Sequence, residues 1–197
     1  MNIRHSCRAA SLLALLLAAC QPAAPAADAP PLAGSSIGGP FALTDQNNRP
    51  VTERDFAGRY RIMYFGYTFC PDVCPTDVQT IAAGLKQVEA KNPALAAKVV
   101  PIFVTVDPAR DTPAVVKQFV SAFHPRMVGL TGSHEAIEQA KKTFAVFSAK
   151  GAETPGGYLV DHSRQAYLMG PKGEPLALVP QDQGPRAVAD AIERWVE

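Results

Sequence analysis

The chain has 197 residues, of which 47% are hydrophobic and 19% are charged, and its formal net charge is +1. These values are ordinary for a soluble globular protein with one sizeable core. They exclude the basic stripe that nucleic-acid-binding proteins normally carry, so we expect no nucleic-acid partner.

Residues 1–20 have the pattern of an export signal. Arg4 and Arg8 precede an apolar run at residues 12–17 that is too short to span a bilayer as a mature helix. The run ends in Leu-Ala-Ala-Cys20, which resembles the lipobox of bacterial lipoproteins, whose cysteine is lipidated and becomes the first mature residue. We therefore expect a lipid anchor on Cys20 that holds the protein on the extra-cytoplasmic, periplasmic face of a bacterial membrane. The alternative is an ordinary signal peptide with a chance cysteine.

The next segment, residues 21–36, is rich in Ala and Pro and has almost no charge. Such a composition cannot bury a core and predicts an extended tether. The globular domain is expected over residues 37–197.

Within that domain, apolar patterning predicts strands alternating with helices. Strands are expected at residues 41–44, 50–52, 59–65, 99–106, 127–130, 158–160, 165–169 and 176–179, with the first two in a hairpin. Helices are expected after Cys74, after the capping residues Thr112 and Ser133, and at the C-terminus. The alternation predicts an α/β thioredoxin-like fold, with a central mixed sheet flanked by helices and an added N-terminal hairpin.

Two cysteines, Cys70 and Cys74, follow the predicted strand at residues 59–65. Pro75 suits the first position of a helix, so both cysteines are expected at or just before a helix N-terminus. Unpaired N–H groups and the helix dipole favour the thiolate there and lower a thiol pKa. Positions i and i+4 share one face of a helix, so both sulfurs are expected to point at one atom.

The same pair is also expected to form a redox-active disulfide. Cys7 leaves with the signal and Cys20 carries lipid, so Cys70 and Cys74 are the remaining thiols in an oxidising compartment. A bridge across so short a loop constrains little unfolded chain, which makes a structural staple the weaker alternative. We expect a labile disulfide that blocks metal binding until a thiol reductant opens it.

A third metal ligand is expected at His162, in the segment Val160-Asp-His-Ser163. In a thioredoxin-like domain the loop that enters this strand faces the cysteine turn. The alternative is a structural histidine, which is how we interpret His124 and His134, as surface or capping residues. Two thiolates and one imidazole suit copper, especially Cu(I), whereas structural zinc requires four ligands. Asp72 and Asp161 are candidates for orienting these ligands.

Three motifs together resemble those of the Sco (SenC-like) copper chaperones. They are Tyr64-Phe-Gly-Tyr-Thr-Phe-Cys-Pro-Asp-Val-Cys-Pro75, Thr105-Val-Asp-Pro-Ala-Arg-Asp-Thr-Pro113, and Val160-Asp-His-Ser163 with Tyr167-Leu-Met-Gly-Pro-Lys-Gly173. The resemblance implies a thioredoxin-like protein that binds copper, as Cu(I) and Cu(II), through Cys70, Cys74 and His162. It implies a metallochaperone rather than an enzyme, serving the dinuclear copper centre of cytochrome c oxidase. The implied partners are the copper-bearing oxidase subunit or its assembly factors.

Two other functions remain as alternatives. A thiol–disulfide oxidoreductase of this fold carries a cis-proline opposite its cysteines, but the matching position here falls at Ser163-Arg164. A peroxidase that uses Cys70 has only the fold in its favour. We interpret Asp107, Arg110 and Asp111 as a loop held by an Arg–Asp pair and a helix start, rather than as copper ligands.

Overall fold

The computed structural model describes residues 29–197. Its strands are β1 (Ala42–Asp45), β2 (Pro50–Thr52), β3 (Tyr60–Gly66), β4 (Val99–Thr105), β5 (Val128–Thr131), β6 (Ser148–Thr154), β7 (Gly157–His162), β8 (Ala166–Met169) and β9 (Pro175–Val179). Its α-helices are α1 (Val73–Lys91), α2 (Pro93–Ala97), α3 (Pro113–Ser121), α4 (His134–Thr143) and α5 (Pro185–Trp195). The short 3-10 helices η1 (Glu53–Phe56) and η2 (Gln181–Gln183) complete the elements.

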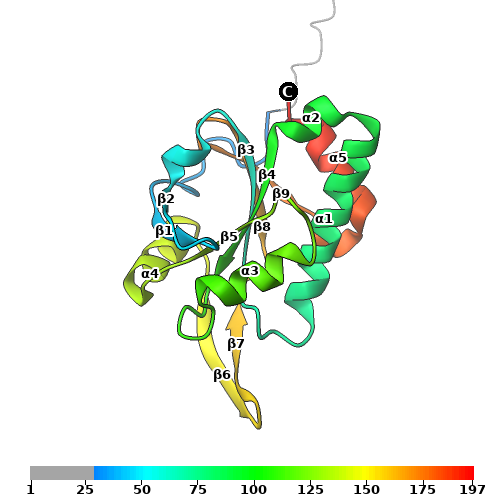
Figure 1. Ribbon diagram of the computed structural model, residues 1–197. Helices are drawn as coiled ribbons and strands as arrows, with labels where there is room; N and C mark the ends of the chain where they lie inside the picture. The colour runs from blue at the N-terminus through cyan, green and yellow to red at the C-terminus, as the bar shows by residue number, and fades with distance from the viewer. Residues whose placement is uncertain (1–28) are drawn as a thin grey trace, which may run out of the picture.

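Seven strands form the main sheet in the order β2-β1-β5-β4-β3-β8-β9 (Figure 1). The three strands β3, β4 and β5 run parallel. Strands β1 and β8 flank them antiparallel, and the edge strands β2 and β9 pair antiparallel with β1 and β8. Every residue of β3 and β4 is buried, because helices cover both faces of these apolar strands. The predicted thioredoxin-like fold, with its mixed sheet and its N-terminal hairpin of β1 and β2, is confirmed.

Successive side chains of β3 point to opposite faces of the sheet, and this alternation places the cysteine helix. Tyr64 faces α1, where its hydroxyl reaches Asp77 at 3.0 Å. Phe65 faces the other side and packs on Phe144, which follows α4, with ring centroids 5.3 Å apart. Helices α1 and α5 pack against each other on the first face. The predicted helix caps are also confirmed, since the hydroxyls of Thr112 and Ser133 accept N–H groups of α3 and α4.

A two-stranded ribbon of β6 and β7 projects from the main sheet (Figure 1). The strand predicted at residues 158–160 belongs to this ribbon and pairs with β6, which the sequence did not predict. It does not pair with the next predicted strand, at residues 165–169. Instead β8 pairs with β3, and the segment 163–165 carries the chain from the ribbon into the main sheet.

The N-terminal end of the described chain contacts the domain. The N–H of Leu32 donates to the carbonyl of Leu176 at 2.9 Å, and that of Gly38 to Thr143. These contacts place residues 30–36 on the domain surface, ahead of the predicted boundary at residue 37. The predicted signal with Cys20 and the first part of the tether lie outside the described residues. Between residues 29 and 197 no helix is both long and apolar enough to cross a membrane.

Candidate metal centre

The cysteine turn lies at the carboxyl end of β3. Helix α1 begins at Val73, so Cys74 is in its first turn while Cys70 precedes it. The expectation that both cysteines share a helix face is wrong, because the helix starts between them. The backbone N–H of Cys74 nevertheless donates to Sγ of Cys70, with an N–S distance of 3.4 Å. A free N–H at the start of α1 thus stabilises the first sulfur, as the sequence predicted.

The two thiols differ in burial and in charge. Both are unbridged; Cys74 is fully buried and Cys70 is partly exposed. A hydrogen bond from the side chain of Cys74 lowers the pKa of Cys70, and hydrogen bonds from the backbone of Asp72 and Cys74 lower it further. The pKa of Cys74 is raised by its hydrogen bond to Cys70 and by burial. One proton is therefore held on the buried sulfur while the accessible sulfur is a thiolate, the form that attacks disulfides and binds metals.

His162 is the last residue of β7 and reaches the buried cysteine. Its Nε2 lies 3.1 Å from Sγ of Cys74. Its Nδ1 lies 2.8 Å from the carbonyl oxygen of Ser163, and a carbonyl can only accept, so Nδ1 carries the proton. In the neutral ring the lone pair of Nε2 therefore faces the sulfur, which is the tautomer that ligates a metal through Nε2. The rings of Tyr64 and Tyr67 meet the imidazole edge-on and fix its plane.

The loop after β4 supports the cysteine turn. The carboxylate of Asp111 is buried and accepts the N–H and the hydroxyl of Thr68, two residues before Cys70. Arg110 forms an ion pair with Asp107, and its guanidinium lies 3.7 Å from the ring centroid of Tyr158. None of the three motif residues contacts a sulfur, which fits the structural interpretation of this loop.

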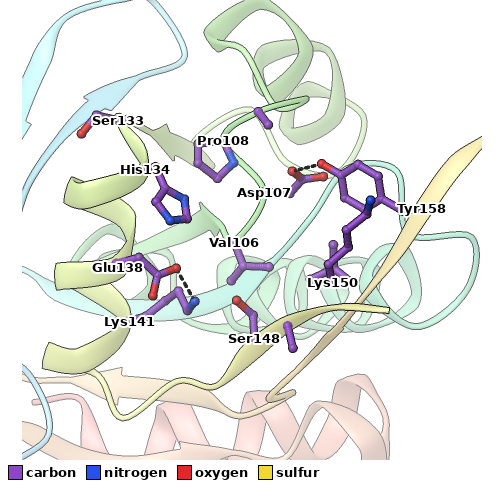
Figure 2. A pocket seen from close by; sticks show the side chains of 14 residues that line it. Val106, Asp107, Pro108, Ser133, His134, Glu138, Lys141, Ser148, Lys150 and Tyr158 are labelled. Carbon is purple, nitrogen blue, oxygen red and sulfur yellow. Dashed lines mark hydrogen bonds and ion pairs between the residues drawn. The ribbon is translucent and has the colours of Figure 1, made fainter. Parts of the chain in front are cut away.

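Beside this loop lies a hollow of about 510 Å³ between the ribbon and α4 (Figure 2). Tyr158 reaches across one side of it and donates to Asp107 at 2.8 Å. His134, the exposed first residue of α4, lines it on the other side, as expected for a surface histidine. The lining contains neither cysteine and not His162, so the hollow is separate from the candidate metal centre.

The two predicted orienting carboxylates stand apart from the sulfurs. Asp72 and Asp161 are exposed, and neither carboxylate is hydrogen-bonded to a cysteine or to His162 in the part of the chain that the structure describes. Sequence reasoning missed a different carboxylate on the same helix: the buried Asp77, which forms an ion pair with Arg164. Asp77 gave one signal in the sequence, since it follows Cys74 by three residues and so lies on the same, buried face of α1.

His124 is not a surface or capping residue, and that prediction is wrong. Its side chain is 1% exposed, because Glu89 of α1 reaches over it and accepts from Nε2 at 3.2 Å. Its Nδ1 accepts the backbone N–H of Arg126 at 3.2 Å. Both ring nitrogens are thus used by oxygen and backbone partners, and the histidine is structural.

The candidate centre offers two sulfurs and one imidazole nitrogen. Over residues 29–197 no group of three or more His, Cys, Asp or Glu side chains has the spacing needed to hold a metal ion. Two of the three donors are nevertheless in direct contact, since Sγ of Cys74 and Nε2 of His162 lie 3.1 Å apart. A metal that binds here must displace the thiol proton of Cys74, and the soft donor set that remains fits copper better than calcium, magnesium or four-coordinate zinc.

Comparison with known proteins adds relatives to this geometry. The family model SCO1/SenC matches residues 29–197. The mitochondrial SCO1 homolog 1 of Arabidopsis thaliana is 42% identical over 143 residues, which are 72% of this chain and 42% of that protein. The chain thus spans less than half the length of this curated relative.

Two solved structures are similar over the whole domain. The copper-bound ScoI of Arabidopsis thaliana has a TM-score of 0.75 and 36% identity, covering 80% of this chain and 97% of that one. The copper-bound ScoI of Bradyrhizobium japonicum has a TM-score of 0.73 and 38% identity, covering 81% of this chain and 99% of that one.

Proposed function

The chain belongs to the SCO1/SenC family, and from this membership we propose that its domain is a copper-binding metallochaperone. The proposed cargo is Cu(I) or Cu(II), held by Cys70, Cys74 and His162. The proposed recipient is the dinuclear copper centre of cytochrome c oxidase, reached through the copper-bearing subunit or its assembly factors. The copper-bound relatives support the cargo, and the family resemblance of the motifs supports the recipient.

One observation carries the ligand set: Nε2 of His162 lies 3.1 Å from Sγ of Cys74, and the backbone N–H of Cys74 donates to Sγ of Cys70. The third donor comes from β7, 88 residues away in the sequence. Soft sulfur donors hold Cu(I), and the imidazole adds the nitrogen that Cu(II) prefers. Exchange between the two oxidation states therefore needs only small movements of donors that are already in contact.

The same proposal includes a redox switch formed by the two thiols. A Cys70–Cys74 disulfide has no thiolate to offer, so oxidation blocks loading and a thiol reductant restores it. Thiol–disulfide exchange proceeds by thiolate attack, and in the disulfide the partly exposed Cys70 offers an accessible sulfur to the thiolate of the reductant. A thiol–disulfide oxidoreductase would share this switch but would not depend on His162.

The place of action is the second part of the proposal. Lipidation at Cys20 would hold the domain on the periplasmic face of the membrane. Membrane fractionation of the wild type and of Cys20→Ala is the check. We expect the wild type to stay with membranes in high salt and the variant to be released or to remain as uncleaved precursor.

Copper content of the purified full chain tests the function. The reduced protein, dialysed against a weak chelator, should retain one Cu(I), and the oxidised protein should retain none until a thiol reductant is added. His162→Ala should lose most Cu(II) binding. Full copper loading of the oxidised form, or Cu(II) spectra unchanged in His162→Ala, would contradict the proposal and leave thiol exchange as the better account.

A further inference from the structure

A single buried carboxylate joins three elements behind the candidate metal centre. Asp77 is 1% exposed and lies one helical turn after Cys74 in α1. It accepts the hydroxyl of Tyr64 on β3 at 3.0 Å. It also accepts both Nε and Nη2 of Arg164, at 3.2 and 2.9 Å, in a two-pronged ion pair.

Arg164 belongs to the segment 163–165, which starts directly after His162. This segment lies between β7 and β8 and has no partner strand of its own. Ser163 is held to Phe147 by two hydrogen bonds, of 2.9 and 3.0 Å. Arg164 is held by its carbonyl, which accepts from Gln181 at 2.7 Å, and by its side chain on Asp77. The bond to Asp77 is the side-chain link from this segment to the helix that carries Cys74.

We propose that Arg164, acting through Asp77, is a positioning residue that holds the imidazole of His162 against the sulfur of Cys74. The inference rests on the proposed copper function of these two ligands. The carboxylate is three residues after one ligand, and the guanidinium is two residues after the other. Their ion pair therefore runs alongside the contact between the ligands and fixes the separation of the two elements.

Stability alone does not account for the pair. The side chain of Asp77 is 2% exposed, and burying a carboxylate costs free energy that an ion pair at best balances. The side chain of Arg164 is 49% exposed, so solvent screening weakens the attraction that could offset this cost. What a two-pronged Arg–carboxylate pair adds is fixed direction and distance, because the planar fork matches the two oxygens.

The effect on copper should depend on its oxidation state. Two sulfurs satisfy Cu(I), whereas Cu(II) relies more on the nitrogen donor. Loosening the segment 163–165 should therefore weaken Cu(II) binding by about 10- to 100-fold, the usual cost of losing a residue that orients a ligand. Cu(I) binding should change by less than about threefold, since His162 contributes less to that complex.

The test compares Arg164→Gln, Arg164→Lys and the double variant Asp77→Asn/Arg164→Gln with the wild-type chain. The double variant removes both charges together, so no unpaired buried carboxylate remains if Arg164→Gln alone fails to fold. Arg186→Gln is the matched control, because it makes the same change in an exposed ion pair with Asp190 on α5. Measurements are Cu(I) and Cu(II) affinities by chelator competition, the sulfur-to-Cu(II) absorption band, and the ¹⁵N shifts of the His162 ring without metal.

We expect the Arg164→Gln and double variants to lose Cu(II) affinity, to shift the Cu(II) band and to move the His162 shifts, with partial rescue in Arg164→Lys and none of these changes in Arg186→Gln. Wild-type Cu(II) affinity and band in folded Arg164→Gln or in the double variant would overturn the inference. If the wild type binds no copper, the proposed function fails, and the metal-free ¹⁵N shifts then decide the positioning role by themselves: unchanged shifts overturn it and altered shifts support it.

Discussion

Two histidines at opposite ends of α1 show how differently the same side chain is used. His162 meets Cys74 at the start of the helix, and His124 meets Glu89 near its end. In His162 the proton sits on Nδ1 and Nε2 faces a sulfur. In His124 the tautomer is reversed, because Nδ1 accepts the N–H of Arg126 and Nε2 donates to the carboxylate.

The difference teaches that burial alone does not identify a functional histidine. His124 is the more buried of the two, yet both of its nitrogens have partners that no ligand can easily replace. His162 leaves its lone pair against a thiol, whose proton a metal can displace. The nature of the partner atom, rather than the depth of the ring, separates a ligand from a structural residue.

Removing either sulfur of the candidate centre should have the largest effect on copper binding. Cys74→Ala or Cys70→Ala should lower Cu(I) affinity by at least about 100-fold, since even residues that only orient a ligand cost 10- to 100-fold. Chelator competition under anaerobic conditions measures this. Val78→Ala is the control, because it shortens another buried side chain of α1 without touching a donor. Copper loss in Val78→Ala as well would show that core damage, not ligand loss, is being measured.

Truncating each histidine should separate the two roles next. His162→Ala should weaken Cu(II) binding by at least about tenfold and alter the sulfur-to-copper absorption, because the nitrogen donor is gone. His124→Ala should leave both unchanged. Equal Cu(II) affinities of His162→Ala and His124→Ala would contradict the assignment of different roles to the two histidines.

The free energy of unfolding should fall more in His124→Ala than in His162→Ala, the reverse of the order for Cu(II) binding. His124→Ala leaves the N–H of Arg126 and a carboxylate oxygen of Glu89 without their partner, which should lower the free energy of unfolding by about 2 kcal/mol. His162→Ala should cost under about 1 kcal/mol, since the ring is only half-buried. Urea denaturation of the reduced, metal-free proteins measures both. An equal loss in the two variants would remove the distinction drawn here.

The smallest expected effect is a change in the free energy of unfolding at low pH, through Glu89. Burial opposes ionisation of Glu89, but hydrogen bonds from Arg126 and His124 outweigh it and lower its pKa. A carboxyl whose pKa falls on folding stabilises the protein above its unfolded pKa, and this contribution is lost as pH falls through the folded value. We expect the stability difference between wild type and Glu89→Gln, at most about 1 kcal/mol, to be present at pH 7, to shrink as pH falls below the unfolded glutamate pKa of about 4.3, and to vanish below the lowered folded value. A difference that persists in acid would contradict this origin.

How far the sequence could predict this structure depends on the range of the interactions. The buried strands β3 and β4 and the caps at Thr112 and Ser133 follow from local patterns, and all were predicted. Strand β6 was missed because it has no buried face, so its sequence shows no alternation of apolar and polar residues. Its mostly exposed residues are Ser-Ala-Lys-Gly-Ala-Glu-Thr. The ion pair of Asp77 and Arg164 joins residues 87 apart in the chain, so no local pattern announces it.

The candidate centre was predicted in its donors but not in its geometry. Cys70, Cys74 and His162 could be singled out because their chemistry is specific, and the structure brings them together. The start of α1 after Cys70 and the burial of His124 by Glu89 depend on packing between distant segments, which spacing along the chain does not encode.

The absence of a side chain at Gly66 sets a limit on mutational tolerance in this domain. A Cβ at this position would lie 3.1 Å from Sγ of Cys74 and 2.9 Å from the ring of Tyr64. Even a methyl group would therefore press on the buried sulfur, and through it on the imidazole, without altering any donor atom. A screen of variants that scores only the cysteines and histidines would miss this position, yet Gly66→Ala is the smallest substitution by which a distortion of the centre could enter through the backbone of β3.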